Sequence, residues 1–221
     1  MSSLVIVEDD KRFSVVLRKM LQQYGFTIDA FFYNANDFLN YIKKTNRYPD
    51  LCLFDLELPD KSGVEIVHEI QDYLEIFPVL ILTSFSDENK VFEAIKSGAS
   101  GYILKKELSL KLKDSITEAI NGGVVIEPIL ATKFFNYFKT FETIKTNEIN
   151  KNNASKVNLQ TEEKELLEFL IKGFTYKEIA SFTDKTPRNV KYILTKIYKK
   201  LGVKSKVKAI SEAIRLGLVN I

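Results

Sequence analysis

The first 120 residues alternate between short apolar runs and longer stretches with helical spacing, and this alternation limits the possible folds more than any other feature. Five runs have strand character, at residues 4–7, 28–33, 51–54, 79–83 and 102–104. Five stretches have apolar residues at helical spacing, at residues 13–24, 37–44, 64–73, 89–97 and 110–120. Strands that alternate with helices favour a parallel sheet with helices on both faces. We therefore expect a doubly wound, five-stranded α/β domain.

The last 63 residues predict a second, all-α domain of four short helices. Thr161 is expected to cap the first helix, which runs to about residue 171. The spacing of Thr175 and Glu178 predicts a capping box at the start of the second helix. Residues 183–185 form a tight turn, and a third helix with Pro187 in its first turn then runs to residue 201. Ser205 caps a fourth helix. Two short helices joined by such a turn are typical of a helix-turn-helix.

Charge and composition divide the chain into three parts. Residues 1–127, the expected α/β domain, hold 14 Lys/Arg and 20 Asp/Glu, a net charge of −6. Residues 128–158 contain an aromatic stretch with helical character and then a polar stretch, which we interpret as a linker. Residues 159–221, the expected helix-turn-helix domain, have a net charge of +6. A basic domain beside an acidic one indicates two modules with different partners, the basic one meeting a polyanion.

Acidic and polar residues follow several of the expected strands, at the point where each strand ends. They are Glu8, Asp9, Asp55, Thr83 and Lys105. Ligands of open α/β sheets bind at the carboxyl ends of the strands. Carboxylates gathered there repel one another, so a hard cation is expected, and a lysine and a hydroxyl beside them suit a phosphoryl group. Asp10 is interpreted as the first residue of a helix and not as a ligand.

Four motifs of the first half resemble those of response-regulator receiver domains. They are VIVEDD at residues 5–10, LFDLELP at 53–59 with Gly63 following, LTS at 82–84 and GASGYILK at 98–105. Together they cover about residues 3–122. The resemblance implies a flavodoxin-like receiver in which Asp55 accepts a phosphoryl group from a histidine kinase. It implies Mg²⁺ as cofactor, held by Glu8, Asp9, Asp55 and the backbone carbonyl of Glu57.

The same resemblance assigns the phosphate-binding and switch residues. Lys105 would pair with the phosphoryl group as a point charge. Thr83 would donate a hydrogen bond to it and move towards it. Tyr102 matches the aromatic residue that turns inward when Thr83 moves, although a buried aromatic at this position is also explained by core packing alone.

The last domain resembles the output domain of NarL/LuxR-type regulators. The matching stretches are LQTEEKELL at residues 159–167, GFTYKEIA at 173–180, NVK at 189–191, KLGV at 200–203 and Ser205. We expect the helix spanning 186–201 to bury Val190, Ile193, Ile197 and Leu201. Its other side would contact double-stranded promoter DNA through Arg188, Lys191, Tyr192, Thr195, Lys196, Lys199 and Lys200. Asn189 and Ile193 depart from the usual residues, which leaves the individual base contacts open.

The expected function is a phosphorylation-controlled DNA-binding transcriptional regulator that forms a homodimer when phosphorylated. An alternative is a phosphorylation-independent regulator that uses the receiver as a dimerisation scaffold. A nucleotide-dependent enzyme is a further alternative, but the chain has none of the glycine-rich phosphate loops or nucleophile elbows that such enzymes carry, and we expect no enzyme. The absence of an 18-residue apolar run or a signal peptide favours a cytoplasmic location with no membrane partner.

Overall fold

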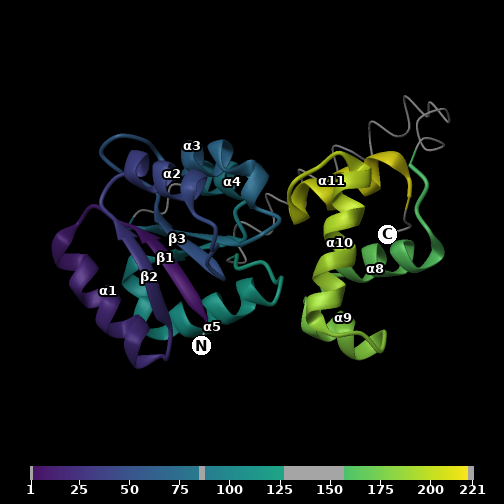
Figure 1. Ribbon diagram of the computed structural model, residues 1–221, viewed down its shortest axis with the longest axis horizontal. Coiled ribbons are helices and arrows are strands. Elements are labelled where there is room, and N and C mark those ends of the chain that lie inside the picture. Colours follow the sequence, from purple (N-terminus) through teal and green to yellow (C-terminus); the bar gives the residue numbers. More distant parts are fainter. Residues whose placement is uncertain (1, 85–87, 127–156, 219–221) are drawn as a thin grey trace. The chain divides into compact units, whose positions relative to one another are not determined.

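A five-stranded parallel sheet forms the centre of the N-terminal unit, in the order β2-β1-β3-β4-β5 (Figure 1). The strands are β1 (Ser3–Val7), β2 (Thr27–Phe32), β3 (Leu51–Asp55), β4 (Val79–Thr83) and β5 (Gly101–Leu104). Every residue of β1, β3 and β4 is buried, as expected for apolar strands covered on both faces. The predicted fold class is confirmed, and each strand lies within one residue of its predicted limits.

The structure is a computed structural model that describes residues 2–84, 88–126 and 157–218. Within it the chain divides into two compact units, Met1–Ile120 and Asn121–Ile221. The segment predicted as an aromatic stretch and linker, residues 128–158, lies almost wholly outside the described residues. The domain limits placed at residues 127 and 159 therefore stay a prediction.

Helices cover both faces of the sheet, with α1 and α5 on one side and α2, α3 and α4 on the other (Figure 1). Their bounds are α1 (Lys11–Gln23), α2 (Ala35–Lys44), α3 (Gly63–Glu69), α4 (Glu88–Ser97) and α5 (Leu108–Ile120). The expected helix at residues 64–73 is shorter than predicted. It ends at Glu69, and a separate 3-10 turn, η1 (Gln71–Tyr73), follows.

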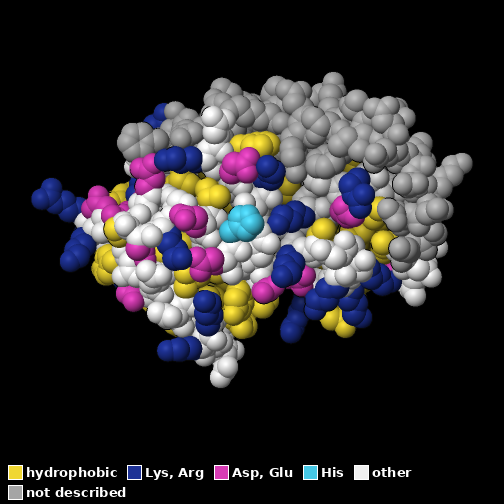
Figure 2. Space-filling view, turned by 90° about the horizontal axis from the view of Figure 1, so that it is seen from above, with side chains coloured by type: hydrophobic (Ala, Val, Ile, Leu, Met, Phe, Trp, Pro, Cys, Tyr) yellow, Lys and Arg dark blue, Asp and Glu magenta, His cyan; other side chains and the backbone are white. Residues whose placement is uncertain are grey.

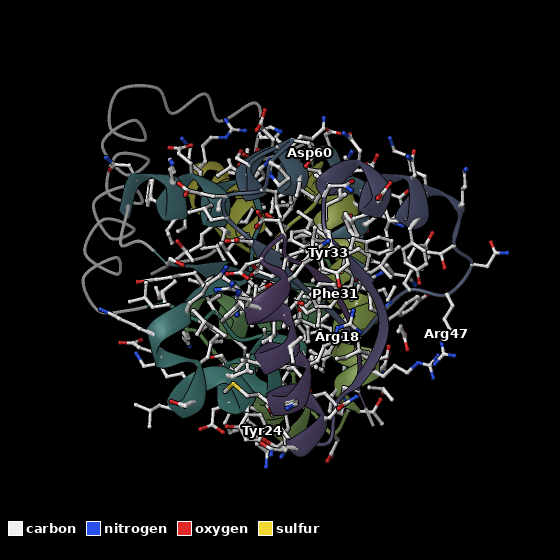
Figure 3. All side chains as sticks on the ribbon, turned by 90° about the vertical axis from the view of Figure 1, so that its left-hand side faces the viewer. Arg18, Tyr24, Phe31, Tyr33, Arg47 and Asp60 are labelled. Carbon is white, nitrogen blue, oxygen red and sulfur yellow. The ribbon has the colours of Figure 1, made fainter. Side chains whose placement is uncertain are left out.

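The edge strand β2 is covered by side chains of α1. The guanidinium of Arg18 lies 4.1 Å from the centre of the Phe31 ring, and Phe31 in turn lies 5.3 Å from the ring of Tyr33 (Figure 3). Asp10 caps α1, because its side chain accepts hydrogen bonds from the backbone N–H groups of Arg12 and Phe13 at 2.7 and 3.1 Å. The interpretation of Asp10 as a helix-terminal residue is confirmed.

In the described residues 157–218, the second unit has the four predicted helices: α8 (Thr161–Ile171), α9 (Tyr176–Phe182), α10 (Pro187–Leu201) and α11 (Lys206–Leu216). The Thr175–Glu178 capping box and the caps at Thr186 and Ser205 are present. Asp184 lies in the turn between α9 and α10 with φ of 51°, a left-handed conformation that Asp tolerates. The helix-turn-helix is therefore built by the local signals that the sequence carries.

Two details of the second unit differ from expectation. Gln160, not Thr161, is the N-terminal cap of α8, and its backbone N–H donates to the Glu163 carboxylate at 2.8 Å. On α10 the buried apolar positions include Leu194 and Tyr198, whereas Ile193 is only partly buried at the edge of the core. The side of α10 that packs on the core is therefore rotated slightly from the predicted side, because Leu194 and Tyr198 are buried and Ile193 is not fully buried.

Candidate functional site

The carboxyl ends of β1, β3, β4 and β5 bring the predicted polar residues to one edge of the sheet. Glu8 directly follows β1, Asp55 ends β3 and Thr83 ends β4; all three side chains are buried. Lys105 follows β5 in a short 3-10 turn, η2 (Lys105–Glu107). Because β1, β3, β4 and β5 are neighbours in the sheet, residues separated by up to 97 positions in the chain meet in one pocket.

Lys105 joins the two central carboxylates of this pocket. Its Nζ atom donates hydrogen bonds to Oε1 of Glu8 and Oδ2 of Asp55, both at 2.9 Å, and lies 2.7 Å from Oε2 of Glu8. The ammonium group also lies 4.4 Å from the centre of the Phe13 ring, on α1. One cation therefore holds two buried carboxylates in place, with an aromatic ring beside it.

Three carboxylates of the pocket are close enough to share a metal ion. Oxygen atoms of Glu8, Asp9 and Asp55 lie within 4.8 Å of one another. Hard divalent cations prefer carboxylate oxygens, and Asp9 is exposed, which leaves the cluster open to solvent. Asp10 stands apart, since its side chain caps α1. The donor set therefore fits a hard divalent cation.

Burial dominates the ionisation of the pocket. Desolvation raises the pKa of Glu8 to about 7, although the hydrogen bond from Lys105 opposes the rise. Burial also raises the pKa of Asp55, again against Lys105. Burial acts to lower the pKa of Lys105, but the hydrogen bonds to Glu8 and Asp55 outweigh it and the pKa is raised. Lys105 is thus a firmly protonated cation in a pocket where extra negative charge is costly.

The loop after β3 is held close to Asp55 by Gly63. A Cβ atom at this glycine would lie 2.9 Å from the carbonyl oxygen of Asp55 and 3.1 Å from Cα of Leu56. The Gly63 N–H donates to the Leu56 carbonyl at 2.8 Å. The same loop is tied to α2 by Asp60, whose carboxylate accepts from the N–H groups of Ala35 and Asn36, both at 2.9 Å. Close backbone approach therefore sets the conformation around Asp55.

The switch residues named from the sequence lie on the two strands beside the pocket. Thr83 is 1% exposed and Tyr102 is 7% exposed, so both side chains are buried. Ile81 pairs with Tyr102 and Thr83 with Leu104, which places the two residues on adjacent strands. Phe85, two residues beyond Thr83, lies outside the described residues.

Two contacts at this edge were not foreseen in the sequence. Phe13 lies under the Lys105 ammonium, and the Glu57 carboxylate pairs with Lys90 of α4 at 2.8 Å. The Glu57 N–H also points to Oδ1 of Asp55, at 3.4 Å. Phe13 and Lys105, like Glu57 and Lys90, come from separate elements with no shared motif, so no sequence spacing predicts either contact.

The side of α10 opposite its core carries the residues predicted to meet DNA. Arg188, Tyr192, Lys196 and Lys199 are exposed, and Lys191 and Thr195 are partly buried. Dark-blue Lys and Arg side chains gather on the C-terminal unit in the face shown in Figure 2. Lys196 lies over the Tyr192 ring, with Nζ 4.3 Å from its centre, and this ammonium lowers the pKa of Tyr192. The structure thus brings six of the seven residues to a shared basic, open face.

Lys200 differs from the other predicted DNA-contacting residues. Its Nζ atom donates to the Glu163 carboxylate of α8 at 2.6 Å, and Glu163 is buried. Glu163 makes two structural contacts, since its carboxylate also accepts a hydrogen bond from the backbone N–H of Gln160 at the start of α8. A capping-box spacing in the sequence points to the second contact but not to the first. Lys200 therefore joins two helices of the unit in addition to any role on its surface.

Comparison with known proteins identifies both units. Residues 4–117 match the family described as the response regulator receiver domain. Residues 157–213 match the bacterial regulatory proteins of the luxR family. This chain belongs to the LuxR-family response regulators. Receiver and output domain follow each other in the order that the sequence motifs predict, so the resemblance stated from those motifs is confirmed.

Similar response regulators come from several bacteria. The transcriptional regulatory protein YdfI of Bacillus subtilis is 32% identical over 173 residues, which cover 78% of this chain and 77% of that protein. The response regulator protein VraR of Staphylococcus epidermidis is 33% identical over 172 residues, or 77% of each chain. Each similarity is longer than either matched domain, so each includes parts of both.

Solved structures support the same architecture. A LuxR-family DNA-binding response regulator from Staphylococcus aureus is 26% identical, with a TM-score of 0.50, and covers 55% of this chain and 100% of that one. RcsB of Salmonella typhimurium, at 17% identity and a TM-score of 0.52, covers 95% of this chain and 96% of its own, and shows the shared fold. Among the helices described in this response regulator, none is long and apolar enough to cross a membrane.

Proposed function

We propose that this response regulator is a DNA-binding transcriptional regulator controlled by phosphorylation of Asp55. A histidine kinase supplies the phosphoryl group, and α10 with its cap at Thr186 contacts promoter DNA. The observation that carries the proposal is the position of Lys105. Its Nζ lies 2.9 Å from the Asp55 carboxylate, at the edge of a three-carboxylate cluster suited to a divalent cation.

The pocket residues fit phosphoryl transfer to a carboxylate. An oxygen of Asp55 forms a bond to phosphorus while the bond from phosphorus to the donor imidazole nitrogen breaks, and the imidazole leaves. Lys105 is already at hydrogen-bond distance and pairs with the new negative charge, and Thr83 lies at the end of the adjacent strand β4. Mg²⁺ held by Glu8, Asp9, Asp55 and the Glu57 carbonyl would neutralise the charge of the incoming phosphoryl group.

The output domain has the charge and shape expected of a DNA-binding module. Residues 159–221 carry a net charge of +6, and basic residues on α10 face away from the core. Cationic side chains that neutralise phosphates supply most of the non-specific affinity for DNA, and a helix in the major groove reads base edges. One such module binds only a short half-site, so we propose that two phosphorylated chains pair on DNA. A solved RcsB structure, at 17% identity, is described as dimers bound to DNA.

A phosphorylation and binding experiment tests the proposal. The full chain is incubated with phosphoramidate and Mg²⁺, and incorporation is followed by intact mass. We expect one phosphoryl group in the wild type and none in Asp55→Asn, together with a gain in DNA affinity on phosphorylation of the wild type only. Labelling of Asp55→Asn to the wild-type extent contradicts the site. Equal DNA affinity with and without phosphorylation favours the receiver as a dimerisation scaffold.

A further inference from the structure

The exposed face of α10 contains an apolar patch set among its basic residues. Tyr192 is 58% exposed, a large fraction for an aromatic side chain. Phe182, the other strongly exposed aromatic of the described output domain, packs in a cluster with Phe169 and Phe174, at centroid distances of 5.6 and 5.2 Å. Tyr192 instead lies on the face opposite the core, where the ammonium of Lys196, one turn further on, contacts its ring.

Lys196 restrains the Tyr192 ring without hiding it. The Nζ atom lies 4.3 Å from the ring centre, which is within the range of a cation–π contact. The contact uses one face of the ring, and the side chain as a whole stays 58% exposed. A side chain restrained before binding loses less conformational freedom when a ligand packs on it. The Tyr192 ring is therefore a preorganised apolar surface on the exposed, mostly basic side of α10.

Thr195 adds to this patch in an unexpected way. Its hydroxyl donates to the backbone carbonyl of Lys191 at 2.9 Å, so its one donor hydrogen is already used. The side chain then offers its methyl group and the oxygen lone pairs. Tyr192 and Thr195 lie three positions apart, on neighbouring turns of one side of α10. Together they present carbon surface and the acceptor oxygen of Thr195, and the Tyr192 hydroxyl is the one donor of the pair.

We infer that Tyr192 and Thr195 read an A·T base pair by packing on the C5-methyl group of thymine, and that Lys196 positions Tyr192 for this contact. Thymine is the base that presents a methyl group in the major groove, and the acceptor oxygen of Thr195 suits the amino group of the paired adenine. The inference rests on the proposed DNA binding and names the base pair that the central part of α10 selects.

Removal of single thymine methyl groups provides the test. High-affinity duplexes are selected from a random pool with the full chain. Beryllofluoride, a mimic of the phosphoryl group, and Mg²⁺ are present. Each thymine of the selected site is then replaced by deoxyuracil, which lacks only the methyl group. For the wild type, we expect one position in each half-site at which the change weakens binding about fourfold, the factor for burial of one methyl-sized group.

Variants of Tyr192 and Lys196 show which side chains cause this loss of affinity. Tyr192→Ala should bind thymine and deoxyuracil equally at this position, whereas Tyr192→Phe, which keeps the ring, should retain the discrimination. Lys196→Ala should reduce it and Lys196→Arg should restore it, since arginine also stacks on aromatic rings. A general loss of charge in Lys196→Ala weakens binding to thymine and deoxyuracil duplexes alike, whereas a loss of positioning removes the difference between them.

Three outcomes overturn the inference. One is discrimination that persists in Tyr192→Ala, and another is discrimination that disappears in Tyr192→Phe. The third is a selected site that is insensitive to every methyl removal while remaining sequence-specific. A wild-type chain that binds no duplex at any salt concentration contradicts the proposed function itself, and the inference falls with it.

Discussion

Nζ of Lys90 in α4 lies 2.8 Å from Oε1 of Glu57, in the loop two residues beyond Asp55. Each side chain is about half exposed, at 50% and 52%, so the ion pair adds at most about 1 kcal/mol to stability. Its position matters more than its energy, because it restrains the side chain of Glu57, whose backbone N–H lies 3.4 Å from Oδ1 of Asp55, the proposed phosphorylation site.

Lys90→Ala is expected to shorten the lifetime of the phosphoryl group on Asp55 several-fold. Without Lys90 the Glu57 carboxylate can accept a hydrogen bond from water and orient it towards phosphorus. Glu57→Gln should remove the effect of Lys90→Ala. The matched control is Lys96→Ala, which breaks the pair with Glu93 within α4 and should leave the lifetime unchanged. Intact mass followed over time after removal of the phosphodonor gives the rates, and equal rates for Lys90→Ala and Lys96→Ala contradict this account.

Lys105→Ala should make the receiver depend on Mg²⁺ for stability. Removal of the ammonium leaves Glu8 and Asp55 without their shared cation, and one-sided loss of a buried pair costs about 3–5 kcal/mol. A divalent cation on the same carboxylates offsets part of this loss. Melting temperatures with and without Mg²⁺ should differ more in Lys105→Ala than in the wild type. Lys106→Ala, a change at the exposed neighbouring residue, is the control. An equal rise of melting temperature with Mg²⁺ in the wild type and both variants contradicts the prediction.

Gly63→Ala should destabilise the receiver by roughly 1–3 kcal/mol, the usual cost of overpacking. The added Cβ would lie 2.9 Å from the Asp55 carbonyl oxygen, so the loop must shift and phosphorylation should slow. Ser62→Ala breaks the capping box of α3 and costs about 1 kcal/mol without touching the Asp55 backbone. Denaturant unfolding and labelling rates should therefore separate the two variants. A Gly63→Ala protein that labels as fast as Ser62→Ala contradicts the packing argument.

Lys200→Ala and Glu163→Gln should each destabilise the output domain, by about 1–3 kcal/mol for a buried charged group that loses its partner. Lys199→Ala, one residue away and exposed, should not. A weaker DNA affinity of Lys200→Ala is therefore partly a structural effect. Thermal unfolding of the three variants tests the assignment, which is wrong if Lys200→Ala and Lys199→Ala melt together.

The same ion pair predicts an acid limit to output-domain stability. Burial acts to raise the pKa of Glu163, but the hydrogen bonds from Lys200 and Gln160 outweigh it, and the pKa is lowered. A lowered carboxylate pKa stabilises the folded state above the unfolded value, about 4.3, and this contribution is lost as pH falls through the folded value. The stability difference between wild type and Glu163→Gln should be full above about pH 5 and shrink below about pH 4. A difference that stays constant across this range contradicts the mechanism.

Much of this protein was determined by sequence alone. The strands β1, β3 and β4 each contain a continuous apolar run, so their burial followed from residue type, and the alternation of strands with helices predicted a parallel sheet. The caps at Thr186 and Ser205 follow from local hydrogen bonding that is encoded within a few residues. The pocket residues Glu8, Asp55 and Lys105 were predictable because each one directly follows or ends a strand.

Tertiary structure decided the contacts that join separate elements. Lys90 with Glu57, Phe13 with Lys105 and Glu163 with Lys200 each pair residues that no shared motif relates. The packing of α10 also decided which apolar residues it buries, since Leu194 and Tyr198 lie in the core and Ile193 lies at its edge. The physical reason is the range of the interactions. Backbone capping and periodicity act over a few residues, whereas ion pairs and ring contacts form only after packing has brought distant elements within about 4–6 Å.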